Sequence, residues 1–224
     1  NEKKGLFPNT KWKKNNLGRG WVLGETLITG IGQGYIQSTP LQLCMMTAQI
    51  ANGGYAIKPK IIVDSNPISY EDAKQSMESG LLFDSNSDSL LDKKLFKNKK
   101  NIKIVQEAMF ASTNERFGTS YKSRIDDPKY QFAGKTGTAQ VKKISKRERE
   151  LDLELEQIPY KDRDHALYVA YGPYINPRYA LSIIIEHGGS GSKAAAPIAK
   201  KLFKLIIDRH ELRNKQSNFE RFTI

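Results

Sequence analysis

The sequence has little cysteine and little histidine, and each shortage excludes a class of protein. Of its 224 residues only Cys44 is a cysteine, so the chain can form neither an internal disulfide nor a thiolate zinc site. The three histidines, His165, His187 and His210, stand apart in the sequence without the spacing of metal ligands. We therefore expect no metal site and no other cofactor.

Long hydrophobic runs are missing as well. The stretch Ser182–Ile185 is among the longest apolar runs, whereas a helix that spans a bilayer needs roughly 20 apolar residues. The first residues do not have the pattern of a signal peptide. If the protein is anchored in a membrane, we expect the anchor to lie outside this sequence.

Acidic residues are fewer than basic ones, 24 against 36, which gives a formal net charge of +12. Six lysines fall between Lys93 and Lys103, where they alternate with asparagine. Surfaces that bind single-stranded nucleic acid interleave basic residues with aromatic stacking platforms, and this stretch does not follow that pattern. We interpret it as a solvated basic face and expect no nucleic-acid partner. The alternative, a basic nucleic-acid module, predicts binding that weakens steeply with salt.

Hydrophobic periodicity changes along the chain and divides one expected domain into four parts. We predict an irregular segment, a helical segment, a segment of three strands with a final helix, and a tail. These parts cover, in order, residues 1–38, 39–134, 135–210 and 211–224. Within the third part we expect the strands at Lys135–Val141, Ala166–Gly172 and Tyr179–Glu186 and the helix at Ala194–Arg209.

Two helices are expected in the helical segment. The first begins with Thr39 as N-cap, Pro40 at the first helical position and Gln42 placed to close a capping box. The second covers Ile102–Phe117, and Gly118 ends it.

The strands are rich in β-branched and aromatic residues, and the PYINPR sequence between the second and third suits an antiparallel connection. With 38% hydrophobic residues, the chain can bury a sizeable core. Helices combined with an antiparallel sheet predict an α+β fold in which helices flank the sheet.

The most informative short motif is Lys135-Thr136-Gly137-Thr138. On a strand, Lys135 lies on one face, and Thr136 and Thr138 lie on the other. Gly137 leaves the backbone open to close approach. An ammonium group, hydroxyls and a backbone N–H at Thr138 could together hold a carboxylate and polarise a carbonyl. Taken alone, the string also fits an ordinary edge strand with a solvated lysine.

The motif occurs within a longer pattern of four segments, which are Gly24–Leu43, Ala133–Val141, Asp164–Pro177 and His187–Phe203. Together and in this order, the four segments resemble the C-terminal half of the transpeptidase domain of class B penicillin-binding proteins. FPNTKW followed by GRGWVLGET is similar to the elongation type of that family. The resemblance implies a partial penicillin-binding and serine β-lactamase-like transpeptidase fold. It also implies that residues 1–224 form the C-terminal part of a single transpeptidase domain.

The resemblance implies a function as well. Members of this family crosslink the peptide stems of peptidoglycan by serine acyl transfer, in which an S-x-x-K serine attacks the D-Ala-D-Ala carbonyl. The implied partners are stem peptides ending in D-Ala-D-Ala, β-lactam antibiotics and a glycan-polymerising membrane protein. The implied location is the periplasmic face of the inner membrane.

The resemblance assigns roles to four residues of this sequence. Lys135 would orient the S-x-N serine and attract the terminal carboxylate. The hydroxyls of Thr136 and Thr138 would bind that carboxylate, and Gly137 would complete the substrate-binding strand. The Thr138 N–H would supply half of the oxyanion hole. The implied catalytic residues are therefore Lys135 and Thr138.

Two other motifs of the family occur here only out of order. Ser190 begins an S-x-x-K string and Ser112 begins an S-x-N string, but the family places both motifs before the GIGQG region. We expect neither serine to stand near Lys135, and we expect the true nucleophile to lie upstream of Asn1. The chain alone should then be inactive. An alternative is a non-catalytic penicillin-binding-like scaffold, which would lack the S-x-x-K motif altogether.

Overall fold

The computed structural model describes residues 3–57, 59, 94–142 and 153–221. Contacts between residues divide the chain into two compact units, Asn1–Leu43 and Cys44–Ile224. None of the helices in the described ranges is long and apolar enough to cross a membrane.

The first unit contains two short helices, α1 (Thr10–Leu17) and α2 (Leu23–Gly30). The Asn9 side chain caps α1 by accepting a hydrogen bond from the Trp12 N–H at 2.8 Å. The expectation that residues 1–38 are irregular was therefore wrong. The reason is that α1 is largely polar and eight residues long, so its local caps rather than an apolar face mark it as a helix.

Helix α3 (Pro40–Ala51) begins as the sequence predicted. The Thr39 N–H donates to Gln42 Oε1 at 3.0 Å, and the Gln42 N–H donates to Thr39 Oγ1 at 3.2 Å. This reciprocal pair is the predicted capping box. Helix α5 (Lys99–Asn114) lies three residues earlier than predicted at both ends, because the Asn98 side chain caps it through the Lys100 N–H.

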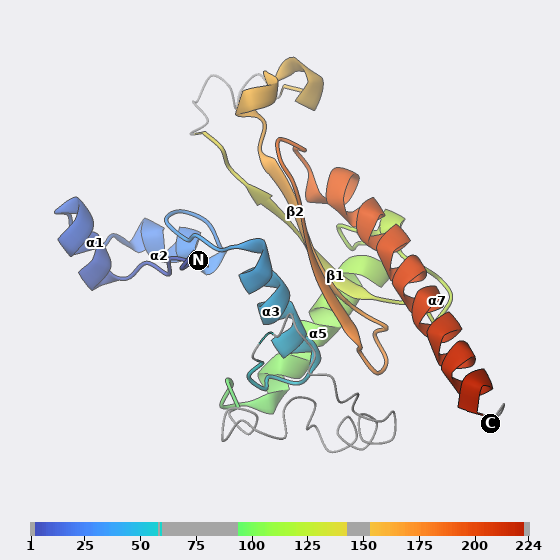
Figure 1. The fold of residues 1–224 in the computed structure, drawn as a ribbon. Helices are drawn as coiled ribbons and strands as arrows, with labels where there is room; N and C mark the ends of the chain where they lie inside the picture. Colours follow the sequence, from blue (N-terminus) through green and yellow to red (C-terminus); the bar gives the residue numbers. More distant parts are fainter. Residues whose placement is uncertain (1–2, 58, 60–93, 143–152, 222–224) are drawn as a thin grey trace. The chain divides into compact units, whose positions relative to one another are not determined.

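Three antiparallel strands form the sheet of the second unit in the order β1–β2–β3 (Figure 1). Their bounds are Ala133–Ala139, His165–Gly172 and Tyr179–Ile185. The α+β class and the strand order are thus confirmed, although β1 lies two residues earlier than predicted. Short 3-10 helices occur at Tyr121–Ser123, Leu155–Gln157 and Tyr160–Asp162.

Helix α7 (Ala196–Arg221) follows a π-helical turn, η4 (Gly191–Ala195). The expected tail from residue 211 is therefore wrong up to Arg221, and the helix continues because no glycine or proline follows Arg209 in this stretch.

Alternate residues of β2 contribute to two hydrophobic clusters. Tyr168 and Ala170 pack with Phe203 and Ile207 of α7, and Tyr171 packs with Met109 of α5. This alternation is expected of a strand buried on both faces.

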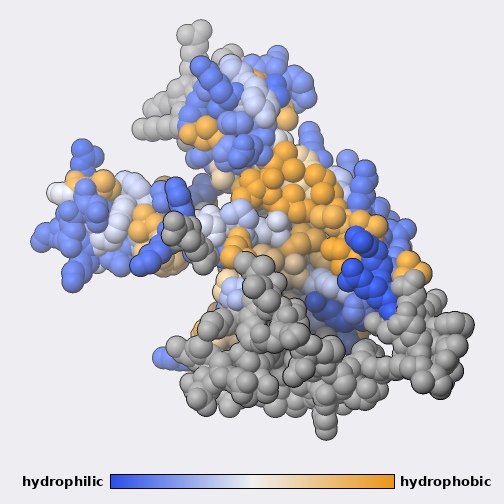
Figure 2. Space-filling model, in the orientation of Figure 1, coloured by the Kyte–Doolittle hydropathy of each residue, from blue (hydrophilic) through white to orange (hydrophobic). Residues whose placement is uncertain are grey.

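The two edge strands of the sheet, β1 and β3, differ in the kind of surface that they form. Each residue of β3 is partly exposed, and β3 pairs only with β2 among the described residues. Figure 2 shows hydrophobic residues gathered over the place that β3 occupies in Figure 1. The opposite edge is β1, which carries the predicted site.

Candidate functional site

The four residues of the predicted site lie in the middle of the edge strand β1. Lys135 and Thr138 are exposed, whereas Thr136 and Gly137 are partly buried. In the register of the sheet, Thr136 is opposite Tyr168 of β2. The Lys135 Nζ donates a hydrogen bond to the backbone oxygen of Thr136 at 2.8 Å. The ammonium group therefore lies close to its own strand.

A chain of hydroxyl groups leads from this strand to helix α5. The Oγ1 atoms of Thr136 and Thr119 are 3.1 Å apart, and the Oγ1 atom of Thr119 is 3.3 Å from the Oγ atom of Ser112. The expectation that Ser112 stands away from the site was therefore wrong. Ser112 is two hydrogen bonds from Thr136, because the chain after α5 folds back toward β1.

Backbone contacts hold the segment that carries Thr119. The Ser120 N–H and the Ser120 hydroxyl each donate to the backbone oxygen of Ser112 at 3.0 Å. A side chain at Gly118 would meet the backbone oxygens of Ala111 and Ser112 within about 2.5 Å, so only glycine fits this close approach. Thr119 lies between these two fixed residues, which limits where its hydroxyl can lie.

A buried cluster of hydroxyl groups includes Ser120 and so helps to hold the segment that carries Thr119. The Tyr168 hydroxyl is 3.0 Å from both Thr113 Oγ1 and Ser120 Oγ, and all three residues are buried. Burial raises the pKa of Tyr168, against the opposing effect of hydrogen bonds from Ser120 and Thr113. Tyr168 reaches this cluster across Gly134, where a Cβ atom would lie 2.3 Å from the hydroxyl.

The segment with the out-of-order S-x-x-K string, which begins at Ser190, also approaches β1. A Cβ atom at Gly191 would lie 2.8 Å from the backbone oxygen of Gly137, so the residue that follows Ser190 lies close to the site strand. That Ser190 itself does not stand near Lys135 stays a prediction. The Ser190 hydroxyl lies 3.0 Å from the Ser192 hydroxyl. Ser190 precedes the π-helical turn in an extended conformation. No hydrogen bond between Ser190 and Lys193 is present among the described residues.

The arrangement on β1 is suited to bind an anion. Lys135 supplies a positive charge, and the hydroxyls of Thr119, Thr136 and Thr138 lie on or beside the strand. Ammonium and hydroxyl groups are the donors that a carboxylate requires. Sequence reasoning found the strand but missed Thr119, Ser120 and Tyr168. The local signal for Thr119 and Ser120 is a small polar cluster, Gly-Thr-Ser, after the helix, whereas Tyr168 is one of several aromatic residues of a strand.

Two histidines that are far apart in the sequence meet beyond the end of β1. The backbone N–H of His187 donates a hydrogen bond to His165 Nδ1 at 3.0 Å, and the centres of the two imidazole rings lie 4.8 Å apart. His187 Nδ1 lies 2.9 Å from the backbone oxygen of Arg163, which makes this nitrogen the donor. Within the described ranges no group of three or more His, Cys, Asp or Glu residues could hold a metal ion.

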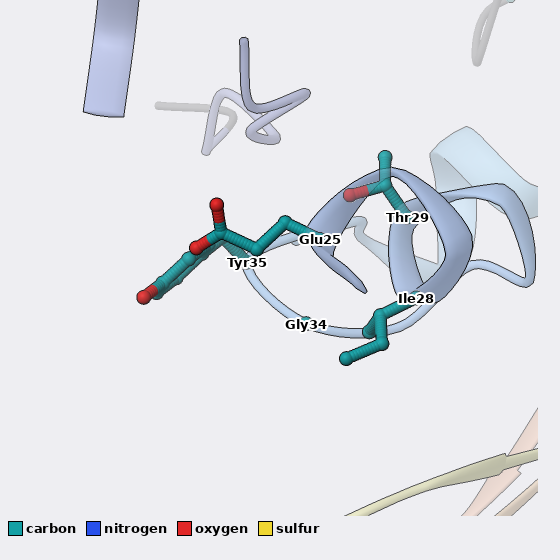
Figure 3. A pocket seen from close by; sticks show the side chains of 5 residues that line it. All are labelled: Glu25, Ile28, Thr29, Gly34 and Tyr35. Carbon is teal, nitrogen blue, oxygen red and sulfur yellow. The ribbon is translucent and has the colours of Figure 1, made fainter. Parts of the chain in front are cut away.

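The first unit contains a cavity of about 250 Å³ lined by residues of α2 and the turn after it (Figure 3). Glu25 is the charged residue of its lining, and it forms an ion pair with Lys13 and accepts a hydrogen bond from the Val22 N–H. The hydrogen bond from Lys13 is the main reason that the pKa of Glu25 is lowered. The remaining lining residues are Ile28, Thr29, Gly34 and Tyr35. Because the carboxylate already has partners, the cavity offers no free acid or base for chemistry.

Comparison with known proteins places this geometry in a family. Residues 1–204 match the family model described as the penicillin binding protein transpeptidase domain. The peptidoglycan D,D-transpeptidase MrdA of Salmonella typhimurium is 31% identical over 208 residues, which are 91% of this chain and 30% of that protein. MrdA of Haemophilus influenzae is 32% identical over 208 residues, with 91% of this chain and 29% of that protein covered. The chain thus spans about 30% of the length of these curated relatives.

Two solved structures are similar in fold and sequence. One is the complex between penicillin-binding protein PBP2 and MreC from Helicobacter pylori, with a TM-score of 0.67 and 32% identity, covering 92% of this chain and 32% of that one. The other is Pseudomonas aeruginosa PBP2 in complex with WCK 5153, with a TM-score of 0.67 and 32% identity, covering 91% and 38%.

Proposed function

The chain belongs to the penicillin-binding protein transpeptidase family, and from this premise we propose that it is the C-terminal part of an elongation-type peptidoglycan D,D-transpeptidase. The reaction is a serine acyl transfer between peptide stems. The serine attacks the carbonyl of the terminal D-Ala-D-Ala bond, D-alanine leaves, and an amine of a second stem resolves the acyl-enzyme. β-Lactams acylate the same serine.

The observation that carries this proposal is the exposed Lys-Thr-Gly-Thr strand at the edge of the sheet. Lys135 attracts the terminal carboxylate of the stem and orients the S-x-N serine. The hydroxyls of Thr136 and Thr138 bind the carboxylate. The Thr138 N–H and the N–H of the nucleophile stabilise the oxyanion that forms during acylation. These roles use the donors that β1 presents.

The nucleophile in this proposal does not come from residues 1–224. Ser190 is bonded to Ser192 and stands outside a regular helix, whereas an S-x-x-K pair needs both side chains on one helical face. Ser112 is part of the hydroxyl chain that supports Thr136. The order of the family's motifs supports a nucleophile outside residues 1–224, and this chain spans about 30% of the length of the relatives.

The proposed surroundings follow from the reaction. Peptidoglycan stems lie outside the cytoplasmic membrane, so the proposal places this domain at the periplasmic face of the inner membrane, with its anchor outside this chain. A partner that polymerises glycan would supply the strands to be crosslinked. The H. pylori relative was solved with MreC, which supports a multiprotein assembly as the working context.

Labelling with a fluorescent penicillin tests the proposed function. We expect the full-length protein to gain one covalent label that resists denaturing electrophoresis. Lys135→Ala should slow acylation by roughly 100- to 1000-fold, the usual cost of losing one electrostatic contact in the transition state. Lys193→Ala is the matched control and should label at the wild-type rate. Equal rates for Lys135→Ala and wild type would overturn the assignment.

The isolated chain tests the position of the nucleophile. Residues 1–224 alone should form no covalent adduct with the labelled penicillin. A stoichiometric adduct that disappears in Ser190→Ala would contradict the upstream nucleophile and would identify Ser190 as the reacting serine.

A further inference from the structure

The carboxylate-binding strand has a hydroxyl neighbour that no motif of the family identifies in this sequence. Thr119 stands 17 residues before Thr136, and its Oγ1 atom is 3.1 Å from Thr136 Oγ1. The same oxygen is 3.3 Å from Ser112 Oγ. Thr119 is therefore the central member of a chain of three hydroxyl groups that ends on the site strand.

Proton counting gives this chain a direction once a carboxylate is bound. An ionised carboxylate only accepts hydrogen bonds, and a threonine hydroxyl has a single proton to donate. If Thr136 donates its proton to the carboxylate, its contact with Thr119 requires that Thr119 be the donor. Thr119 has then used its own proton, so Ser112 must donate to Thr119. The only consistent order is Ser112 to Thr119 to Thr136 to carboxylate.

We propose that Thr119 is a positioning residue for the substrate carboxylate: its hydroxyl donates to Thr136 and so turns the Thr136 proton toward the ligand. The proposal rests on the carboxylate-binding role of Thr136 in the proposed function. A chain of hydrogen bonds that point the same way also polarises each member, which strengthens the last bond to the charged ligand.

The residues on both sides of Thr119 are held against α5, and this limits where the Thr119 hydroxyl can lie. Gly118 touches the last carbonyls of α5, and Ser120 donates twice to the Ser112 oxygen. Ser120 is also 3.0 Å from the buried Tyr168 hydroxyl. Tyr168 is in turn the β2 residue opposite Thr136. Tyr168 thus contacts the residue next to Thr119 through its hydroxyl and is the strand partner of Thr136.

Because Thr119 is exposed, replacing it should leave the fold intact, and the effect of its hydroxyl can be measured alone. Thr119→Val removes the hydroxyl at nearly constant shape, and Thr119→Ser retains it. Thr29→Val, at a threonine whose side chain forms no hydrogen bond with Ser112, Thr119 or Thr136 in the described structure, serves as the matched control for loss of a threonine hydroxyl. All variants are made in the full-length protein, and their melting temperatures are compared with that of the wild type.

The measurement is the concentration dependence of acylation by a labelled penicillin, which separates binding from the acylation step. Thr119→Val should weaken binding by about 3- to 10-fold, the usual effect of one hydrogen bond, and should change the acylation rate constant less than about twofold. Thr119→Ser should bind within about twofold of the wild type, and Thr29→Val should be unchanged.

A penicillin methyl ester distinguishes positioning from a general structural effect. The ester lacks the carboxylate, so Thr119→Val should weaken its binding less than about twofold. Equal losses for acid and ester would overturn the proposal. A second check uses Thr136→Val as background, in which Thr119→Val should have no further effect. A full additional loss in that background would also overturn it.

The outcome is distinguishable from failure of the proposed function. If wild-type protein is not acylated, or if Lys135→Ala is acylated at the wild-type rate, the proposed function fails and this inference fails with it. If Lys135→Ala is strongly impaired while Thr119→Val binds acid and ester with equal loss, only the role of Thr119 is rejected. Ser112→Ala provides an independent variant and should weaken binding of the acid in the same direction by a smaller factor.

Discussion

The two edges of the three-stranded sheet are built from opposite kinds of residue. The β1 strand reads Ala-Gly-Lys-Thr-Gly-Thr-Ala, with small and polar side chains, and the β3 strand reads Tyr-Ala-Leu-Ser-Ile-Ile-Ile. Beside β1, α5 and the segment after it provide hydroxyl groups, and the η4 turn contacts its backbone. The residues of β3 are partly exposed, with no further strand paired to them in the described ranges.

Under the proposed function, this difference would let one edge of the sheet serve chemistry and the other serve assembly. An exposed edge presents free N–H and C=O groups, and a flat apolar edge is a template for another strand. At β1, small residues let neighbouring segments approach and bring their hydroxyls to the strand. At β3, successive isoleucines favour burial. Four predictions test how far this contrast holds, and they start with the largest effect.

The first prediction concerns association through β3. Residues 1–224 expressed alone should self-associate, because no strand in the described part of the chain covers the apolar edge. Ile184→Lys should shift the chain strongly toward monomer, since Ile184 belongs to neither hydrophobic cluster and a lysine at an edge opposes pairing. Sedimentation velocity measures the distribution of species. Thr138→Lys on β1 is the matched change at the other edge and should leave the association unchanged. A monomeric wild-type chain would contradict the role assigned to β3.

The second prediction concerns the room that β1 leaves for Tyr168. Gly134→Ala should destabilise the domain by about 1–3 kcal/mol, the usual cost of overpacking, because the new Cβ atom would lie 2.3 Å from a buried hydroxyl. Gly137→Ala is the control on the same strand. Its Cβ atom would meet the Leu167 Cβ atom at 3.4 Å, an ordinary contact. Thermal unfolding of both variants in the full-length protein measures the difference, and equal stabilities would refute the argument.

The third prediction compares two buried tyrosines on β2. Tyr168→Phe should cost about 1 kcal/mol, because it removes a partner from Thr113 and Ser120. Tyr171→Phe should be neutral or slightly stabilising, since the Tyr171 hydroxyl is buried without a hydrogen-bond partner in the described structure. Denaturant unfolding of the two variants gives the comparison. A larger loss for Tyr171→Phe would show that the hydroxyl cluster does not support the β1 edge.

The smallest expected effect is a pH dependence near the start of β3. Burial and the charges of Arg178 and Arg213 lower the pKa of His210, whose ring lies 5.9 Å from that of Tyr179. Because folding disfavours the protonated form, the stability from this group is present above the ordinary histidine pKa and is lost as the pH falls toward the lowered value. His210→Gln should make the melting temperature depend less on pH in this range. An unchanged acid slope in the variant would exclude His210 as its source.

Much of the fold from Thr39 onward could be predicted from the sequence because its signals are local. The Thr39 and Gln42 capping box, the alternation in the β2 strand and the glycine-rich break at residues 187–192 each specify structure within a few residues. The position of α5 was wrong by three residues because the side chain of Asn98 caps the helix before the predicted start at Ile102.

The parts that sequence reasoning missed depend on contacts between distant segments. Thr119 belongs to the site only because Ser120 bonds to the end of α5 and Tyr168 reaches across Gly134. No spacing rule connects residue 119 with residue 136. Likewise, helices α1 and α2 are short, and α1 has no clear apolar face, so their caps and the Lys13–Glu25 ion pair stabilise them.

The close approach of η4 to the sheet limits which substitutions the sequence can accept at Gly191. An added Cβ atom at Gly191 would meet the backbone oxygens of Leu167 and Gly137, and backbone atoms cannot turn aside as a side chain can. A larger residue at this position would therefore collide with backbone atoms whatever ligand the strand binds. Gly191 is buried, whereas Ser192 is partly exposed and Lys193 is exposed. A lineage that replaced this glycine would first have to move the start of α7 away from the site strand.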